Sequence, residues 1–81
     1  MTINRIYNTS PGQYSIIDAQ LAYTNIDLVS RNGVVYNVLQ PGNEGTVGGL
    51  YVAYFPSLGR LNFDSTMPFE VGETINVIFE L

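Results

Sequence analysis

Glycine and proline punctuate this 81-residue chain and limit what it can fold into. The turn-forming residues are Pro11, Gly12, Asn32, Gly33, Pro41, Gly42, Gly45, Gly48, Gly49, Pro56, Gly59, Pro68 and Gly72. They leave pieces of about five to thirteen residues, the spacing of strands joined by turns. We therefore expect one all-β domain over residues 1–81, a small antiparallel sandwich or barrel. Residues 3–7 can form a short strand; the alternative for residues 1–14 is an extended N-terminal arm.

The strongest turn signal is Asn32-Gly33, because both residues accept the positive φ of a type I′ turn. It lies between β-branched stretches and predicts a hairpin in which Val29 pairs with Tyr36. One face of this hairpin carries Val29, Val34, Tyr36 and Val38, and the other carries Ile26, Leu28, Val35 and Leu39. Both faces are largely apolar, so we expect the hairpin to be covered on two sides.

A second hairpin and a final strand follow. Residues 50–55 form an apolar strand that ends at Pro56, and Pro56–Gly59 turns the chain into a strand over residues 60–63. Residues 74–81 alternate most regularly in the chain. The apolar face of this last strand carries Ile75, Val77, Phe79 and Leu81.

Two structures fit residues 15–23. Residues 15–18 match a capping box that would begin a helix. The same stretch alternates as a strand, with Ile17, Ala19, Leu21 and Tyr23 on one face. We favour the strand, because it leads directly into the strand before the Asn32-Gly33 turn.

Charge excludes several function classes. The chain has three Arg, no Lys, seven carboxylates and a net charge of −4, so it cannot build the positive patch that nucleic acid or an anionic membrane surface requires. It also has no His and no Cys, so a His base, a thiol nucleophile, a Schiff-base amine and a Cys/His zinc site are absent. The N-terminus lacks the apolar core of a signal peptide, and no apolar run approaches the ~20 residues of a membrane helix.

The carboxylates do not suggest a catalytic or metal site. Glu70 and Glu73 lie close in sequence, but we interpret their segment as an exposed turn, and expect Glu70→Gln and Glu73→Gln to have little effect. Asp18, Asp27 and Asp64 are scattered, whereas calcium takes about six to eight oxygens. Residues 43–44 offer oxygen ligands to calcium, but we interpret them as polar loop residues. The glycine tract 42–49 lacks the lysine and following helix of a phosphate cradle. We expect no enzyme activity, cofactor or metal.

The composition instead resembles that of a buried interface. The chain is 46% hydrophobic and only 12% charged, with six Tyr and four Phe, and interfaces favour aromatics and Arg over Lys and carboxylates. Exposed strand edges also need charge or a partner to protect them. The predicted interface residues are Tyr7, Tyr14, Arg31, Tyr36, Tyr51, Tyr54 and Arg60. An alternative use of Tyr7, Tyr14, Tyr51 and Tyr54 is a carbohydrate-binding surface.

Residues 59–64 (GRLNFD) and 68–79 (PFEVGETINVIF) resemble the closing segment of small β domains in the virion proteins of tailed bacteriophages, such as fibre and decoration modules. With residues 29–36, the resemblance covers about residues 27–81. It implies a non-enzymatic virion structural protein that decorates or cements a capsid, or forms part of a tail or fibre. The implied partners are copies of the chain, a trimer being the first expectation, and a larger virion protein such as the major capsid protein.

Two other function classes remain open from the sequence. One is a receptor- or glycan-binding, lectin-like module, which an exposed cluster of tyrosines beside Asn or Asp would favour. The other is a small enzyme accessory or toxin-like domain, which no feature of the sequence supports.

Overall fold

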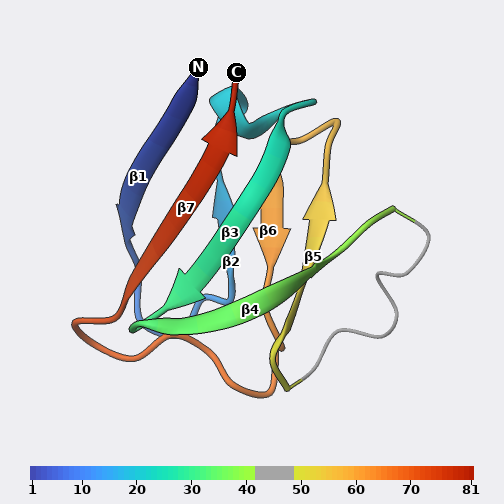
Figure 1. Ribbon diagram of the computed structural model, residues 1–81. Coiled ribbons are helices and arrows are strands. Elements are labelled where there is room, and N and C mark those ends of the chain that lie inside the picture. Colours follow the sequence, from blue (N-terminus) through green and yellow to red (C-terminus); the bar gives the residue numbers. More distant parts are fainter. Residues whose placement is uncertain (42–48) are drawn as a thin grey trace.

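Seven strands form one mixed sheet that curves into a nearly closed barrel, which confirms the predicted all-β class (Figure 1). The computed structural model describes residues 1–41 and 49–81. The strands are β1 (Thr2–Asn8), β2 (Ser15–Ile17), β3 (Asn25–Arg31), β4 (Val34–Leu39), β5 (Tyr51–Phe55), β6 (Arg60–Asn62) and β7 (Thr74–Glu80), with a 3₁₀ turn η1 (Ala19–Leu21). No helix in these two ranges is long and apolar enough to span a membrane.

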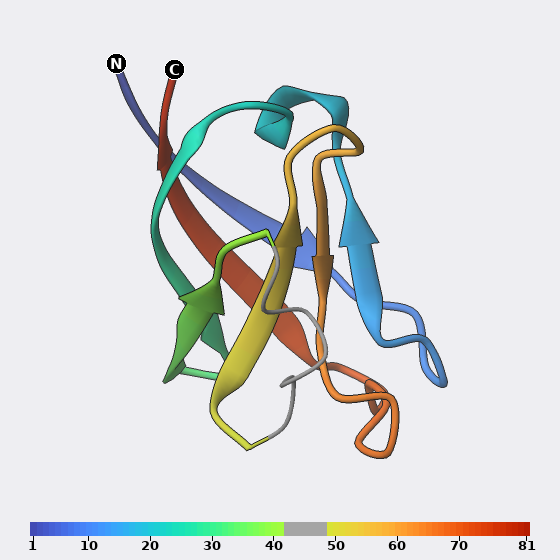
Figure 2. The ribbon, with the colours of Figure 1, turned by 90° about the vertical axis from the view of Figure 1, so that its right-hand side faces the viewer.

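The strand order is β1-β7-β3-β4-β5-β6-β2, and Figure 2 shows β5, β6 and β2 side by side. Every pair is antiparallel except β4 with β5, in which Asn37 pairs with Tyr51 and Leu39 with Ala53. The sheet is therefore mixed, and this one parallel pair is the departure from the antiparallel arrangement that we expected. A parallel pair needs a connection long enough to return the chain to the same end of the sheet, and residues 40–50 supply that length.

The hairpin at Asn32-Gly33 forms in the predicted register, with Val29 opposite Tyr36 and Ser30 opposite Val35. Asn32 and Gly33 have φ values of 50° and 80°, the positive values that a type I′ turn requires. The hairpin is not covered on both sides near its turn, because Val34 and Val35 are 48% and 56% exposed. The second predicted hairpin, β5 with β6, is also present.

Replacing Gly33 with valine should lower the melting temperature. No atom lies within 4 Å of a Cβ placed at Gly33, so the cost arises from the backbone conformation alone. A β-branched residue held at positive φ costs about 1–3 kcal/mol, and each kcal/mol shifts the melting temperature of a domain this small by about 4–8 °C. Circular dichroism melts measure the shift. Gly33→Asn is the control and should melt near the wild type, because asparagine tolerates positive φ. A valine variant that melts like the wild type would show that this turn does not form.

The core fills the inside of the barrel. Its buried apolar side chains come from five strands and from the segments that follow β2 and β6: Ile16, Leu21, Val29, Val52, Tyr54, Leu61, Phe63, Phe69, Ile75, Val77 and Phe79. The predicted alternation of β7 is confirmed, since Ile75, Val77 and Phe79 are fully buried. Leu81 is 61% exposed, because β7 ends at Glu80.

Residues 15–23 form neither the predicted long strand nor a helix. The strand β2 ends at Ile17, and the carboxylate of Asp18 accepts a hydrogen bond from the backbone N–H of Gln20, which caps the single turn η1. The predicted face is also incorrect, because Ile17 and Tyr23 are 66% and 79% exposed. The buried residues of this stretch are instead Ile16 and Leu21.

Residues 2–8 are a strand of the sheet and not a free arm, because β1 pairs with β7 along its whole length. β1 and β2 are the two edges of the sheet, and side chains of β1 bond to Asp18, the residue directly after β2. The Asp18 carboxylate accepts hydrogen bonds from Arg5 Nη1 at 2.9 Å and from the Tyr7 hydroxyl at 2.7 Å. Burial and the bond to Asp18 raise the pKa of Tyr7 to about 12, so the phenol stays protonated and donates. This network closes the seam of the barrel where backbone pairing stops.

Candidate functional site

A hollow of about 620 Å³ lies at the end of the barrel near the Asn32-Gly33 turn. It is bounded by the β3–β4 hairpin, the start of β5 and the segment between β6 and β7. The lining residues are Arg31, Asn32, Val34, Tyr36, Leu50, Thr66, Met67, Pro68, Phe69, Glu70 and Glu73.

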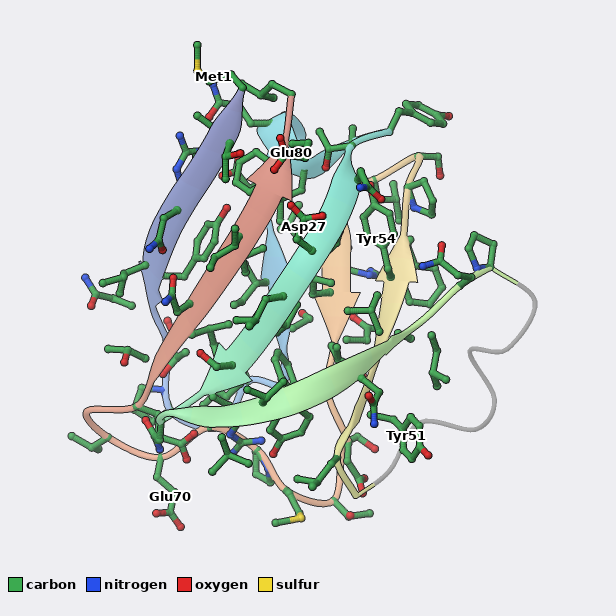
Figure 3. All side chains as sticks on the ribbon, viewed as in Figure 1. Met1, Asp27, Tyr51, Tyr54, Glu70 and Glu80 are labelled. Carbon is green, nitrogen blue, oxygen red and sulfur yellow. The ribbon has the colours of Figure 1, made fainter. Side chains whose placement is uncertain are left out.

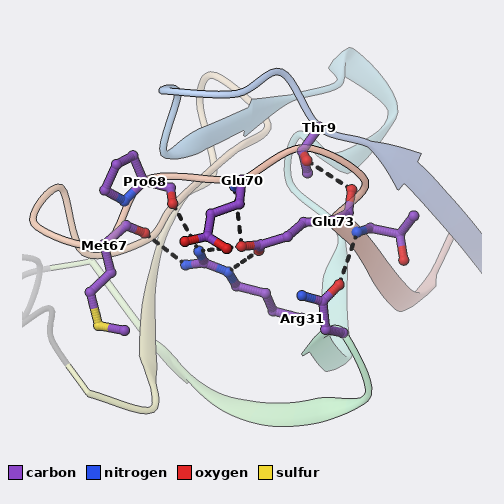
Figure 4. Close-up of polar contacts among 8 residues, drawn as sticks. Thr9, Arg31, Met67, Pro68, Glu70 and Glu73 are labelled. Carbon is purple, nitrogen blue, oxygen red and sulfur yellow. Dashed lines mark hydrogen bonds and ion pairs between the residues drawn. The ribbon is translucent and has the colours of Figure 1, made fainter.

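Arg31 is the central polar group of this hollow and is only 9% exposed (Figure 4). Its Nε and Nη2 donate to the two carboxylate oxygens of Glu73 at 2.6 and 3.1 Å. Nη1 and Nη2 also donate to the backbone carbonyls of Met67 and Pro68 at 3.0 and 3.2 Å. The planar guanidinium matches a carboxylate in this bidentate geometry. Arg31 therefore attaches residues 67–73 to the end of β3.

Aromatic rings surround the same guanidinium. Its central carbon lies 5.1 Å from the ring centre of Phe69 and 5.7 Å from that of Phe63. Phe63 also makes edge-on contacts with Tyr36 and Phe69, with centroids 5.3 and 5.5 Å apart. These rings provide apolar packing and favourable contact for the buried cation. The wall of the hollow is thus fixed by both ionic and aromatic contacts.

The interpretation of Glu73 as part of an exposed turn was wrong. Its hydrogen bonds from Arg31 lower the pKa of the carboxyl against the opposing effect of burial, so it stays ionised at neutral pH. Its Oε1 also accepts the backbone N–H of Glu70 at 3.2 Å, and its carbonyl accepts the Thr9 hydroxyl at 2.8 Å. Glu73 is thus occupied as a structural acceptor, while Glu70 is exposed at the edge of the hollow (Figure 3).

Two of the seven predicted interface residues lie inside the protein, which corrects the prediction for them. One is Arg31. The other is Tyr54, which is 3% exposed and whose hydroxyl donates to the backbone carbonyl of Leu21. Tyr7 and Tyr36 are half-buried; Tyr7 is bonded to Asp18 across the seam and Tyr36 packs on Phe63.

The remaining three are more accessible but do not gather. Tyr14 and Tyr51 are 41% and 44% exposed, and Arg60 is half-buried over the ring of Phe55 at 5.0 Å. Tyr51 begins β5, whereas Tyr54 lies near its other end (Figure 3). Tyr7, Tyr14, Tyr51 and Tyr54 therefore do not form the single carbohydrate-binding surface considered from the sequence.

Sequence reasoning missed the aliphatic rim of the hollow. Val34, Leu50 and Met67 are 48%, 51% and 56% exposed, and all three line it. The sequence placed Val34 on a hairpin face expected to be covered, whereas Leu50 and Met67 stand beside turns and belong to no regular apolar face. Leu50 and Met67, large apolar residues directly beside turn residues, were the feature of the sequence that could have indicated the rim.

The three aspartates lie apart and serve local roles. Asp18 bridges the seam, and Asp64 accepts hydrogen bonds from the backbone and hydroxyl of Thr66. Asp27 accepts the side-chain amide of Asn25 at 3.2 Å, and the neighbouring carboxyl of Glu80 raises the pKa of Asp27 (Figure 3). In the described ranges, no three His, Cys, Asp or Glu side chains come together as metal ligands. Residues 43–44 and most of the glycine tract 42–49 fall outside the described residues.

Comparisons with protein-family models, with curated proteins and with solved structures found no match for this chain.

Proposed function

We propose that this chain is a non-catalytic structural module that assembles with copies of itself and with a larger virion protein in a tailed bacteriophage, where it decorates or cements a capsid or forms part of a tail or fibre. The observation that carries the assembly role is the apolar rim, defined as Val34, Leu50 and Met67 at the mouth of the larger hollow. The phage setting is supported by the resemblance of residues 27–81 to virion modules.

The rim has the chemistry of a protein-binding surface. Soluble proteins rarely leave large apolar side chains grouped around a hollow unless a partner covers them. The charged groups among the residues lining this hollow are Arg31, Glu70 and Glu73. Arg31 and Glu73 form an ion pair and neutralise each other. A partner would therefore bury aliphatic surface here and meet one exposed carboxylate, Glu70.

The rim is also held rigidly before any partner arrives. Met67 is tied through its carbonyl to Arg31, and Val34 follows the type I′ turn directly. A preformed surface loses little conformational entropy on binding. Removing apolar area from water contributes about 25 cal/mol per Å², and repetition of one contact around a symmetric assembly adds avidity.

Placing a charge in the rim should dissociate the assembly without unfolding the chain. Met67→Asp places a carboxylate at a position whose side chain is 56% exposed, so the fold should tolerate the change. An apolar contact with a partner should not tolerate it, because binding would bury the charge. Light scattering coupled to size-exclusion chromatography should give an oligomer for the wild type and a monomer for Met67→Asp.

Ile6→Asp is the matched control, because Ile6 is 68% exposed on β1 and does not line the hollow. It should assemble like the wild type. If Met67→Asp assembles normally while Ile6→Asp dissociates, the interface lies on the β1 side and the role assigned to the rim is wrong.

A further inference from the structure

A second hollow of about 180 Å³ lies beside β5 and β6, and it differs in character from the larger one. Its lining includes Tyr14, Ala53, Phe55, Asn62, Asp64 and Ser65, none of which lines the larger hollow. We propose that this hollow binds one ring of a neutral sugar, a role beyond the assembly function.

Asn62 is the first reason. Its side-chain Oδ1 is buried and has no hydrogen-bond partner among the described residues, although Asn62 lines the hollow. A buried acceptor without a donor costs free energy, so such groups are normally satisfied by protein, water or a ligand. Asn62 stands opposite Ala53 in the β5–β6 pair, and the short side chain of Ala53 leaves space beside it. A ligand hydroxyl in the hollow would supply the missing donor.

Asp64 provides a second acceptor at the same place. Its Oδ1 accepts the backbone N–H of Thr66 at 2.9 Å and the Thr66 hydroxyl at 2.7 Å. These bonds lower the pKa of Asp64, so its carboxylate is ionised and oriented. Oδ2 receives no hydrogen bond within residues 1–41 and 49–81. Two acceptors in one small hollow match a pair of neighbouring hydroxyl donors, and Ser65 adds a hydroxyl.

Tyr14 supplies the aromatic surface. It is 41% exposed, and its carbonyl accepts the backbone N–H of Phe63 at 2.8 Å, which fixes the chain beside the end of β6. The next residue, Ser15, pairs directly with Asn62. An aromatic face beside a few placed polar groups is the usual composition of a small-molecule site. The C–H face of a sugar ring can pack on such a side chain while its hydroxyls meet Asn62 and Asp64.

The charge of the hollow selects the ligand class. The residues that line it include one carboxylate, Asp64, and no cationic side chain, so an anionic ligand would be repelled. Tyr14, Asn62, Asp64 and Ser65 all bring polar groups to the lining, which disfavours a purely apolar ligand. A neutral pyranose fits both conditions.

The test is an NMR titration of ¹⁵N-labelled protein with D-glucose, D-galactose and N-acetyl-D-glucosamine. At least one sugar should shift the Asn62 side-chain amide and the backbone amides of Asp64 and Ser65. Glucose 6-phosphate should bind at least about tenfold more weakly than glucose, because it brings a phosphate to Asp64. Absence of these shifts with all three neutral sugars would overturn the proposal.

Asn62→Leu should weaken binding at least about tenfold and leave folding intact, because an apolar side chain removes the unpaired acceptor. Asn76→Leu is the matched control, since Asn76 Oδ1 is also buried without a partner in the described ranges but does not line the hollow; its binding should be unchanged. If Asn62→Leu does not fold, the more exposed Tyr14→Ala gives the same test. Wild-type affinity in the folded variant overturns the site. None of these changes touches the rim, so the oligomer mass reports separately on the assembly role.

Discussion

A Gly59→Ala variant is expected to lose its folded structure at room temperature. Gly59 has a φ of +62° in the turn between β5 and β6, and its added Cβ would overlap the carbonyl oxygen of Asp18 and lie 3.0 Å from the backbone N of Ala22. Both neighbours are backbone atoms, and the Gly59 carbonyl accepts the N–H of Asp18 at 3.0 Å. The variant must therefore separate the β5–β6 turn from the segment that carries η1.

The expected cost combines two effects. Alanine at positive φ costs about 1–2 kcal/mol, and forcing atoms into a packed region typically adds about 1–3 kcal/mol. A core of this size contributes only about 3–5 kcal/mol of stability, so the sum removes most of it. Far-ultraviolet circular dichroism and thermal melts measure the loss.

Gly72→Ala is the control for the backbone effect alone. Gly72 has a φ of +84° and open space around its added Cβ, so this variant should remain folded with a modest drop in melting temperature. If Gly59→Ala melts at the same temperature as Gly72→Ala, then the close contact of Gly59 with Asp18 does not exist.

The second large effect is expected at the buried ion pair. Arg31→Met should destabilise the protein by about 1–3 kcal/mol, because it leaves the carboxylate of Glu73 without its hydrogen-bond partner. The side chains of Arg31 and Glu73 are only 10% and 11% exposed, so water cannot replace the lost bonds easily. Urea unfolding measures the change in the free energy of unfolding.

The double variant Arg31→Met with Glu73→Leu should recover part of this stability, because no uncompensated charge remains. The two single variants and the double variant complete the cycle. Additive losses would show that the two side chains do not form the pair described above.

Acid should weaken the same contact. The pKa of Glu73 is lower in the folded protein than in the unfolded chain. The ionised carboxylate therefore stabilises the fold at pH values above its pKa in the unfolded chain, and this stabilisation is lost as the pH falls through its pKa in the folded protein. Arg31→Met should therefore show a shallower loss of stability between neutral and acidic pH than the wild type. Parallel pH profiles for both proteins would contradict this linkage. Glu73→Gln, which the sequence predicted to have little effect, should also lower the stability, because the charge of Glu73 holds Arg31.

Local chemistry explains which parts of the fold could be predicted. The Asn32-Gly33 hairpin depends on two residues that accept positive φ, and the alternation of β7 follows from one buried face, so both are visible in a short window of sequence. The barrel class follows from the spacing of turns.

Contacts between distant residues explain what could not be predicted. Arg31 was predicted as an interface residue and not as half of a buried ion pair, since its partner Glu73 is 42 residues away in sequence. The early end of β2 depends on Asp18, which caps η1 and accepts hydrogen bonds from Arg5 and Tyr7 of β1. The parallel β4–β5 pair likewise depends on how the whole sheet closes. Periodicity contains none of this information.

The proposed assembly predicts a mass for the pure wild-type chain that one measurement checks. Sedimentation velocity at low salt and at ~1 M salt should give a multiple of 9.0 kDa at both concentrations, with a trimer as the first expectation. High salt shortens the Debye length to about 3 Å and weakens contacts between exposed charges, but it leaves an apolar contact intact. Mixing with candidate capsid or tail proteins in the same instrument should add a larger complex. A species of 9.0 kDa at both salt concentrations that joins no virion protein would contradict the assembly role.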